Sequence, residues 1–511
     1  MADVAAMSPR ERTVSAKEKT ATVNVLATML GPSKTKEHDA ATAALCRVRD
    51  VFAKQPIFYD QGKDPRVFFT LTDFMAPISH TIIEDIASSM LDVLPFSQCD
   101  VIVSVADRSS GAIAHEVSLA TELPYTLANW YPRGMPGEVE VAPCSGFSGS
   151  GTIWLNGLKR GKRCVIVMDC LRGGSTASNL LAACYRAGCS VVACVFAAEL
   201  LEYRGRQNPG LSGTKVFSLV PIHVRGERTK EARDAGGVIL PPTTPVVPAA
   251  AKKPGEGGDT AEEEEAALAA LLAGGAPVSA LRRADPRNAI IQRLKRMSPE
   301  EVREKTLAVQ HGFVGVPIIT DPNLSYPYSF FQLTDFNPLM TPEVVEMMAD
   351  LCVAKGNFAR CDVIVSEADR GGAPLAQAVA RRTGRPYVLA NWYPFGAGIG
   401  ADTKVSVGFS GDGLIVVNGV RKGDRCIFVD DMLSSGGTAE GVLHSVEKLG
   451  GIPIEGVFVS EKLYPAKKKT GLPLRKGKDR LKATWPHLDV TTLVQFVAEG
   501  ARTFAPHEQI G

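Results

Sequence analysis

The chain has 511 residues, of which 45% are hydrophobic, so it can form more than one core and two domains with connecting segments are expected. Its net charge of +2 gives no overall field that would attract nucleic acid or a membrane surface. No apolar run approaches the length of a membrane span, there is no secretory signal pattern, and the 11 cysteines follow no metal-binding spacing. A cytoplasmic protein with reduced, packed thiols is therefore expected.

An internal repeat organises the chain. Residues 99–200 align with residues 361–462 at a constant offset of 262 without a gap, and roughly four positions in ten are identical. Copies of this size are globular domains rather than solenoid units. We expect an N-terminal helical arm over 1–50, a first domain over 51–225, a Pro/Gly/Ala-rich linker with a short helix over 226–297, and a second domain over 298–505.

Two helix start signals lie in the linker and at the start of the second domain. Thr260 and Glu263 form a potential capping box for a short helix that ends before Gly274. Ser298 followed by Pro299 marks a second helix start, with proline at the first helical position.

Strand and helix patterns alternate in the second copy. Strands are predicted at 362–365, 386–389, 426–429 and 452–459, helices at 375–382 and 438–449, and a hairpin joins 405–407 to 414–417. This alternation indicates an α/β fold with two tandem domains, each a parallel sheet flanked by helices with an inserted hairpin.

The most informative motif lies at the end of the 426–429 strand. Asp430 and Asp431 come first, and a small-residue turn, 434–438, leads into the next helix. In α/β sheets ligands bind beyond the carboxyl ends of the strands, and a helix N-terminus after a glycine turn attracts anions. Carboxylates would repel a phosphate unless a sugar lay between them, so ribose 5-phosphate fits both halves of the motif. The alternative is a solvated turn with a helix cap. The chain has neither the nucleotide-hydrolysing P-loop nor the dinucleotide-binding glycine pattern.

Three segments of the second copy resemble a known family. Val429 to Thr438 resembles the 5-phosphoribosyl-1-pyrophosphate signature of type I phosphoribosyltransferases. Phe331 to Pro338 resembles the purine-side segment of the adenine phosphoribosyltransferase branch, and Glu367 to Gly372 resembles its pyrophosphate loop. The resemblance covers about 170 residues of each half.

The resemblance implies roles for specific residues. Asp430 and Asp431 would be the catalytic pair that holds the ribose hydroxyls. The substrate-binding residues would be Ser434, Ser435, Gly436, Gly437 and Thr438 around the 5-phosphate, and Ala368, Asp369, Arg370 and Gly371 against pyrophosphate. Magnesium would bridge pyrophosphate to ribose, with no protein ligand assigned to it. The implied ligands are phosphoribosyl pyrophosphate and a purine base, with no nucleic acid or membrane partner.

The chain departs from the family pattern in several places. Asp369 is inserted into the pyrophosphate loop, and Asn391-Trp392 replaces a basic pair. The acid of the mobile loop has no clear match. The nearest residues are Asp412 and, more weakly, Asp402 and Lys404. The glycines within 395–400 form either a lid or a plain surface loop.

The first copy departs further. Met168 replaces the first acid while Asp169 keeps the second, Arg172 and Ser175 alter the turn, and Ser109-Ser110 replaces two glycines. A thioether is a weak acceptor for a sugar hydroxyl, so weaker sugar binding is expected, and this degenerate half would serve as a built-in partner for the other. Trp130 and its counterpart in the second copy either stack on a base or pack against other side chains of the protein.

Three functions remain open. The first is a purine phosphoribosyltransferase with a catalytic C-terminal half, the second a non-catalytic assembly protein with the same fold, and the third a regulator that binds the phosphoribosyl ligand without turning it over. The basic stretch 467–480 is either a solvated insertion or a docking surface for anions.

Overall fold

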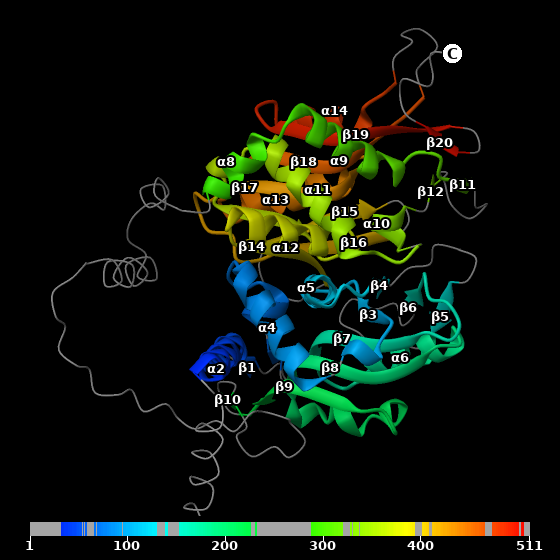
Figure 1. Ribbon diagram of the computed structural model, residues 1–511. Coiled ribbons are helices and arrows are strands. Elements are labelled where there is room, and N and C mark those ends of the chain that lie inside the picture. The colour runs from blue at the N-terminus through cyan, green and yellow to red at the C-terminus, as the bar shows by residue number, and fades with distance from the viewer. Residues whose placement is uncertain are drawn as a thin grey trace, which may run out of the picture.

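The computed structural model contains two large β-sheets flanked by helices, one in each half of the chain (Figure 1). It describes residues 32–504 except 54, 56, 59–65, 68, 95, 130–137, 142–152, 226–229, 232–287, 320–327, 330, 337, 394–400, 408–410, 466–472 and 500–501. The linker helix predicted from Thr260 and the glycine-rich segment 395–400 lie outside the described residues.

The N-terminal sheet has the strand order β10-β9-β8-β7-β3-β4. Its strands are β3 (Val101–Val105), β4 (Tyr125–Ala128), β7 (Arg163–Leu171), β8 (Ser190–Leu200), β9 (Val216–His223) and β10 (Lys230–Glu231). All neighbours are parallel except β10 and β9. Two short antiparallel pairs stand apart, β1 (Ile57–Phe58) with β2 (Arg66–Val67) and β5 (Val139–Val141) with β6 (Ile153–Leu155).

The helices of this half are α2 (Pro32–Phe52), α3 (Thr70–Asp73), α4 (His80–Val93), α5 (Ser110–Thr121) and α6 (Ser175–Arg186). Three single-turn 3-10 helices, Leu201–Tyr203, Gly205–Gln207 and Pro209–Leu211, follow β8, and a further one spans Phe96–Gln98. The sheet's strands are buried on both faces, as the Val- and Ile-rich runs require.

The C-terminal sheet has the strand order β15-β16-β14-β13-β17-β18-β19-β20. Its strands are β13 (Val363–Glu367), β14 (Tyr387–Tyr393), β15 (Ala401–Val407), β16 (Gly411–Val417), β17 (Arg425–Leu433), β18 (Ile452–Leu463), β19 (Asp489–Glu499) and β20 (Arg502–Phe504). The five central strands are parallel, and β15, β16 and β20 run antiparallel to their neighbours. The predicted parallel sheet with an inserted hairpin is confirmed.

The helices of this half are α8 (Asn288–Lys295), α9 (Pro299–His311), α10 (Gln332–Asp335), α11 (Pro342–Lys355), α12 (Gly372–Thr383), α13 (Gly437–Lys448) and α14 (Lys476–Thr484), with a 3-10 turn at Phe358–Arg360. A short antiparallel pair, β11 (Ile318–Ile319) and β12 (Tyr328–Ser329), precedes α10. The predicted start of α9 is confirmed, because the Ser298 hydroxyl accepts a hydrogen bond from the Glu301 amide at 3.1 Å and Pro299 follows it.

Two predicted boundaries shift. Residues 411–413, where the hairpin turn was predicted, lie within β16, because Val407 pairs with Gly411 and Val405 pairs with Gly413. Strand β17 continues four residues past its predicted end at Val429, since its pairing with β18 runs on to Leu433. Both acidic residues of the motif therefore lie within the strand.

The two halves pack against each other through reciprocal contacts. The Tyr125 amide donates to the Met340 carbonyl and the Tyr387 amide donates to the Ile78 carbonyl, both at 2.9 Å. These two contacts are related by the same offset that relates the sequence copies. Helices α5 and α12 meet at the junction, where Gly111 lies against Ala373 (Figure 1). The arrangement is that of an isologous interface formed within one chain.

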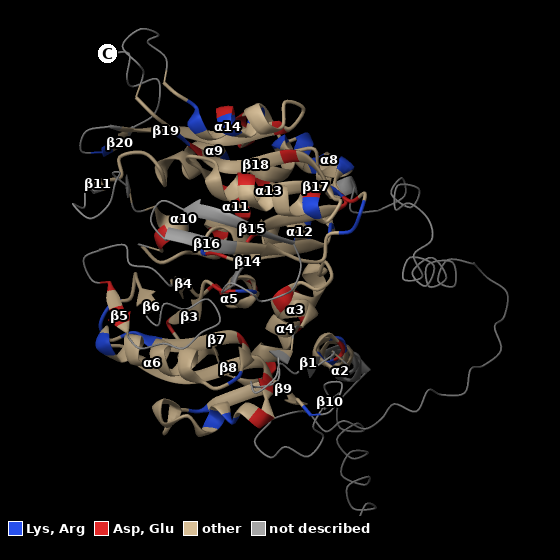
Figure 2. Cartoon of the chain, turned by 180° about the vertical axis from the view of Figure 1, so that it is seen from behind, with Lys and Arg blue, Asp and Glu red and all other residues tan. Residues whose placement is uncertain are grey.

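The distribution of charge, the state of the cysteines and the character of the helices in the described residues are as follows. Charged residues of both signs are spread over both halves (Figure 2). Every described cysteine is a free thiol, and eight of them are buried. No described helix combines the length and the apolar character that crossing a membrane requires.

Candidate functional site

The acidic pair lies buried near the carboxyl end of β17, with Asp430 6% and Asp431 5% exposed. The Thr334 hydroxyl of α10 donates to Asp431 Oδ2 at 2.5 Å. Asp430 Oδ1 is buried and has no hydrogen-bond partner. Burial, reinforced by the neighbouring carboxylates of Asp431, Asp369 and Glu367, raises the pKa of Asp430 well above its usual range. A donor hydroxyl or a cation at Oδ1 would satisfy this oxygen.

The small-residue turn follows directly. Gly436 has φ +80°, a left-handed conformation that favours glycine, and it caps the N-terminus of α13. The Ser434 hydroxyl lies 3.1 Å from the Tyr464 hydroxyl, which comes after β18. The free amides at the start of α13 thus stand beside the buried acids in one strand–turn–helix unit, a layout suited to an anionic group.

Helix α14 covers this turn. A Cβ added to Gly477 would lie 2.6 Å from the Ser434 carbonyl oxygen, so the start of α14 sits directly on the turn. Lys476 Nζ stacks 4.0 Å from the centre of the Tyr464 ring, and Lys462 Nζ lies 5.6 Å from it. Burial, with a smaller contribution from Lys476, lowers the pKa of Lys462.

Sequence reasoning missed Tyr464, Lys476 and the bond from Thr334. The basic character of 467–480 was the signal for Lys476. Its described part forms α14, which is exposed on one side and packs beside the turn through Gly477. Lys467 to Lys469 lie outside the described residues.

The residues of the predicted pyrophosphate loop make contacts with different parts of the protein. Gly371 packs against the acids, since a Cβ there would lie 2.3 Å from Asp431 Cγ. The Asp369 carboxylate accepts a 2.6 Å hydrogen bond from the Gly372 amide at the start of α12. The Ala368 amide donates to the Ala390 carbonyl at 2.9 Å and so continues the sheet.

Arg370 points into the protein. Its side chain is 1% exposed, with Nη1 3.8 Å from Asp335 Oδ1 and Nη2 3.5 Å from the Trp154 carbonyl of the other half. The structure therefore brings Gly371 to the acidic pair, while the charge of Arg370 is held against Asp335 at the junction of the halves.

Asn391 also belongs to this junction. It replaces one residue of the family's basic pair, and its Nδ2 donates to the Thr72 carbonyl of the N-terminal half at 3.3 Å. The side chains of Trp392, Asp402, Lys404 and Asp412, and all of Trp130, lie outside what the structure describes.

Parts of the chain are similar to known proteins. No known family model matches the chain. The adenine phosphoribosyltransferase of Rhodothermus marinus is a similar solved structure, with 22% identity and a TM-score of 0.29 over 38% of this chain and 99% of that one. The hypoxanthine/guanine phosphoribosyltransferase of Methanobacterium lacus is 32% identical over 154 residues, which are 29% of this chain and 79% of that protein. The one from Ferroglobus placidus is 32% identical over 27% of this chain and 72% of that protein.

The chain belongs to the type I phosphoribosyltransferase family. The similarity to each relative covers about a third of the chain or less, and its remaining length includes a second sheet with the same order of central strands.

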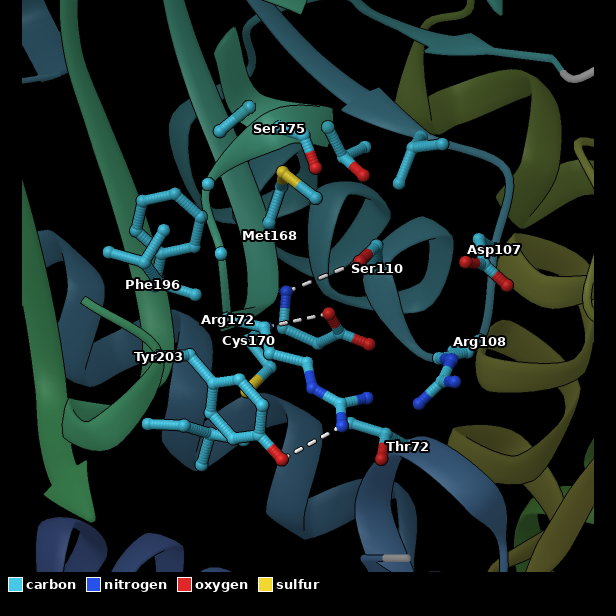
Figure 3. Close-up of a pocket in the computed structure, with 18 of the residues that line it drawn as sticks. Thr72, Asp107, Arg108, Ser110, Met168, Cys170, Arg172, Ser175, Phe196 and Tyr203 are labelled. Atoms are coloured by element: carbon cyan, nitrogen blue, oxygen red, sulfur yellow. Dashed lines mark hydrogen bonds between the residues drawn. The ribbon is translucent and has the colours of Figure 1, made fainter. Parts of the chain in front are cut away.

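The N-terminal half contains a cavity of about 370 Å³ (Figure 3). It is lined by residues equivalent to those of the C-terminal motif, including Met168, Asp169, Arg172 and the turn 173–176. Burial raises the pKa of Asp169, and it also raises that of Asp107, the counterpart of Asp369, to about 6.

The N-terminal acid is satisfied from within the protein. Asp169 Oδ1 accepts from the Cys170 amide at 2.6 Å and Oδ2 accepts from the Ser109 hydroxyl at 3.2 Å. Met168 is buried where the C-terminal half has Asp430. This half therefore has a turn at a helix N-terminus, a place suited to an anion, but it lacks the unsatisfied carboxylate oxygen of the other half.

Proposed function

We propose that the C-terminal half is a purine phosphoribosyltransferase of the adenine type. It would transfer the phosphoribosyl group from phosphoribosyl pyrophosphate to a purine base and release pyrophosphate. The observation that carries the proposal is the buried Asp430 oxygen without a partner, beside Asp431 and the 434–438 turn.

The ribose would lie between the acids and the turn. Its hydroxyls would donate to Asp430 and Asp431, which removes the cost of leaving a buried acceptor unsatisfied. The 5-phosphate would accept hydrogen bonds from Ser434, Ser435 and the amides of Gly436 to Thr438 at the start of α13. Lys476 and Lys462 add positive charge near this end.

Magnesium fits the donor set. Mg²⁺ is commonly held by one or two carboxylates together with substrate phosphates rather than by a cage of protein ligands. The described residues contain no cluster of three or more metal-binding side chains, but the free oxygen of Asp430 is a hard donor of the right kind. When bound, magnesium would neutralise charge on the pyrophosphate.

The chemistry would be a substitution at the anomeric carbon. The bond from this carbon to the pyrophosphate oxygen breaks with its electrons leaving on pyrophosphate, a base nitrogen forms the new bond, and that nitrogen loses its proton. Catalysis would come mostly from holding the two reactants in place in a buried site.

Calorimetry with magnesium and phosphoribosyl pyrophosphate tests this proposal. Binding to the wild type that disappears in Asp430→Asn/Asp431→Asn, but persists in the matched N-terminal variant Asp169→Asn, would support the C-terminal site. Turnover is then measured with adenine, hypoxanthine and guanine, and preference for either of the last two would refute the adenine assignment. Binding that the double variant does not change would refute the site.

A non-catalytic role is the second candidate. It is favoured by Arg370 and Asn391, whose polar groups contact the junction of the halves. Binding without product formation with any purine would indicate a regulator, and absence of binding would leave an assembly protein. In each case we propose a cytoplasmic protein in which the N-terminal half is the built-in partner of the other.

A further inference from the structure

The short helix α10 links the acidic pair of the C-terminal half to the N-terminal half. Its Thr334 hydroxyl donates to Asp431 Oδ2 at 2.5 Å. The carbonyl of Asp335, the last residue of the helix, accepts from Asn156 Nδ2 of the N-terminal half at 3.4 Å. A helix of 4 residues is unstable on its own in water, so its contacts with the rest of the protein determine where α10 lies.

The N-terminal half packs closely on the C-terminal end of α10. The Tyr125 ring of β4 lies edge to face against the ring of Phe336, the residue that caps the helix, with 5.3 Å between the ring centres. A Cβ added to Gly157, which follows β6, would lie 2.3 Å from the Phe336 carbonyl oxygen. Gly157 also has φ +80°, a left-handed conformation that favours glycine. Glycine therefore lets the two backbones meet here, where β4 and β6 face α10 across the junction (Figure 1).

The C-terminal half makes the mirror contact on α3, but this contact leads elsewhere. Asn418 Nδ2 donates to the Asp73 carbonyl at 2.7 Å. A Cβ added to Gly419 would lie 2.5 Å from the Phe74 carbonyl oxygen. The Thr72 hydroxyl, the counterpart of the threonine in α10, donates at 2.5 Å to Asp73 Oδ2 within α3 itself. The path from the junction to a buried acid is thus described for the C-terminal half, while the mirror path ends inside α3.

We propose that Asn156 and Gly157 are positioning residues for the C-terminal site, through which the N-terminal half holds α10 and so orients Asp431. The proposal rests on the function proposed for the C-terminal half. When the contact of either residue with α10 is lost, the helix shifts and Thr334 no longer fixes the carboxylate. A carboxylate that is not fixed binds a sugar hydroxyl less well, because a site must be held to within a fraction of an ångström by its supporting residues. The N-terminal half is then required by the site of the other half.

The test compares Gly157→Ala with its mirror variant Gly419→Ala in the full chain. Each variant puts a Cβ on a left-handed glycine and against a backbone carbonyl oxygen of the other half, at 2.3 and 2.5 Å respectively, so the two should disturb the junction to a similar extent. Calorimetry with magnesium and phosphoribosyl pyrophosphate then measures the C-terminal site. We expect about a tenfold or greater loss of affinity in Gly157→Ala and near-wild-type affinity in Gly419→Ala.

A double-mutant cycle in urea gives a second measurement that needs no ligand. If Asn156 acts through α10, Asn156→Ala and Thr334→Val together should shift the unfolding midpoint by less than the sum of their separate shifts. The shifts of Asn418→Ala and Thr334→Val should add, because Asn418 holds α3 instead. Asn156→Ala only removes atoms, so the cycle remains available if Gly157→Ala does not fold.

The outcomes separate this proposal from the function on which it rests. A wild type that binds no phosphoribosyl pyrophosphate would refute the proposed function, and the cycle alone would then decide whether Asn156 positions α10. Additive shifts for Asn156→Ala and Thr334→Val would overturn the positioning role. So would an affinity that is unchanged in Gly157→Ala, or one that falls equally in Gly157→Ala and Gly419→Ala.

Discussion

Gly371 offers the sharpest test of the C-terminal site. A Cβ there would lie 2.3 Å from both Cγ and Oδ2 of Asp431 and 2.7 Å from its Cβ. Ordinary contact begins near 3.4 Å, so in Gly371→Ala the Asp431 side chain must move by about 1 Å. Because φ at Gly371 is −85°, alanine causes no backbone strain, and the effect is purely steric.

The size of the effect follows from what holds Asp431. Overpacking a buried site costs about 1–3 kcal/mol. Displacing the carboxylate also weakens its 2.5 Å bond from Thr334, a charge-assisted bond worth about 1.5–3 kcal/mol. We expect Gly371→Ala to lose about 2–4 kcal/mol of unfolding free energy and to bind phosphoribosyl pyrophosphate at least tenfold more weakly.

Urea unfolding and calorimetry measure the two effects. Ser109→Ala is the matched control, because it places alanine at the equivalent N-terminal position, where a side chain is already accommodated. The control should lose only about 0.5–1.5 kcal/mol, the cost of one hydrogen bond to Asp169. A Gly371→Ala chain with wild-type stability and ligand affinity would refute the packing argument.

Three further predictions follow from single contacts. Thr334→Val should cost about 1–3 kcal/mol, since Asp431 loses its donor, and Thr334→Ser should restore most of it in urea unfolding. Asn418→Ala should cost about 1–2 kcal/mol because Asn418 Nδ2 donates to the Asp73 carbonyl at 2.7 Å across the junction, and an unchanged unfolding midpoint would contradict this. The pKa of Asp107 is raised to about 6, so the folded state keeps its proton where the unfolded chain has lost it, and this stabilisation disappears as pH rises from about 4 to 6. Asp107→Asn should therefore be more stabilising, relative to the wild type, at pH 8 than at pH 4, by about 1–3 kcal/mol in unfolding titrations, and a difference independent of pH would count against it.

The sequence pattern predicted the individual strands and helices, because these depend on residues that are close together in the chain. The strands and helices of the second copy and the capped start at Ser298 follow from periodicity and capping residues. The position of Asp430 and Asp431 beside the start of α13 follows from the strand–turn–helix order.

The remaining features depend on residues far apart in the chain. Arg370 contacts the Trp154 carbonyl and Asn391 contacts the Thr72 carbonyl because the halves meet there, and no local pattern encodes either contact. Tyr464 reaches Ser434 because β17 and β18 are neighbours, and α14 then packs over both.

The reciprocal junction has a consequence for assembly. In a pair of separate identical subunits, association weakens on dilution and each substitution alters both sides of the interface. Here the partners of Tyr125 and Tyr387 are tethered to the same chain, so association is intramolecular and independent of protein concentration. Each side can also change alone, so that one half can keep the unsatisfied Asp430 while the other replaces it with Met168.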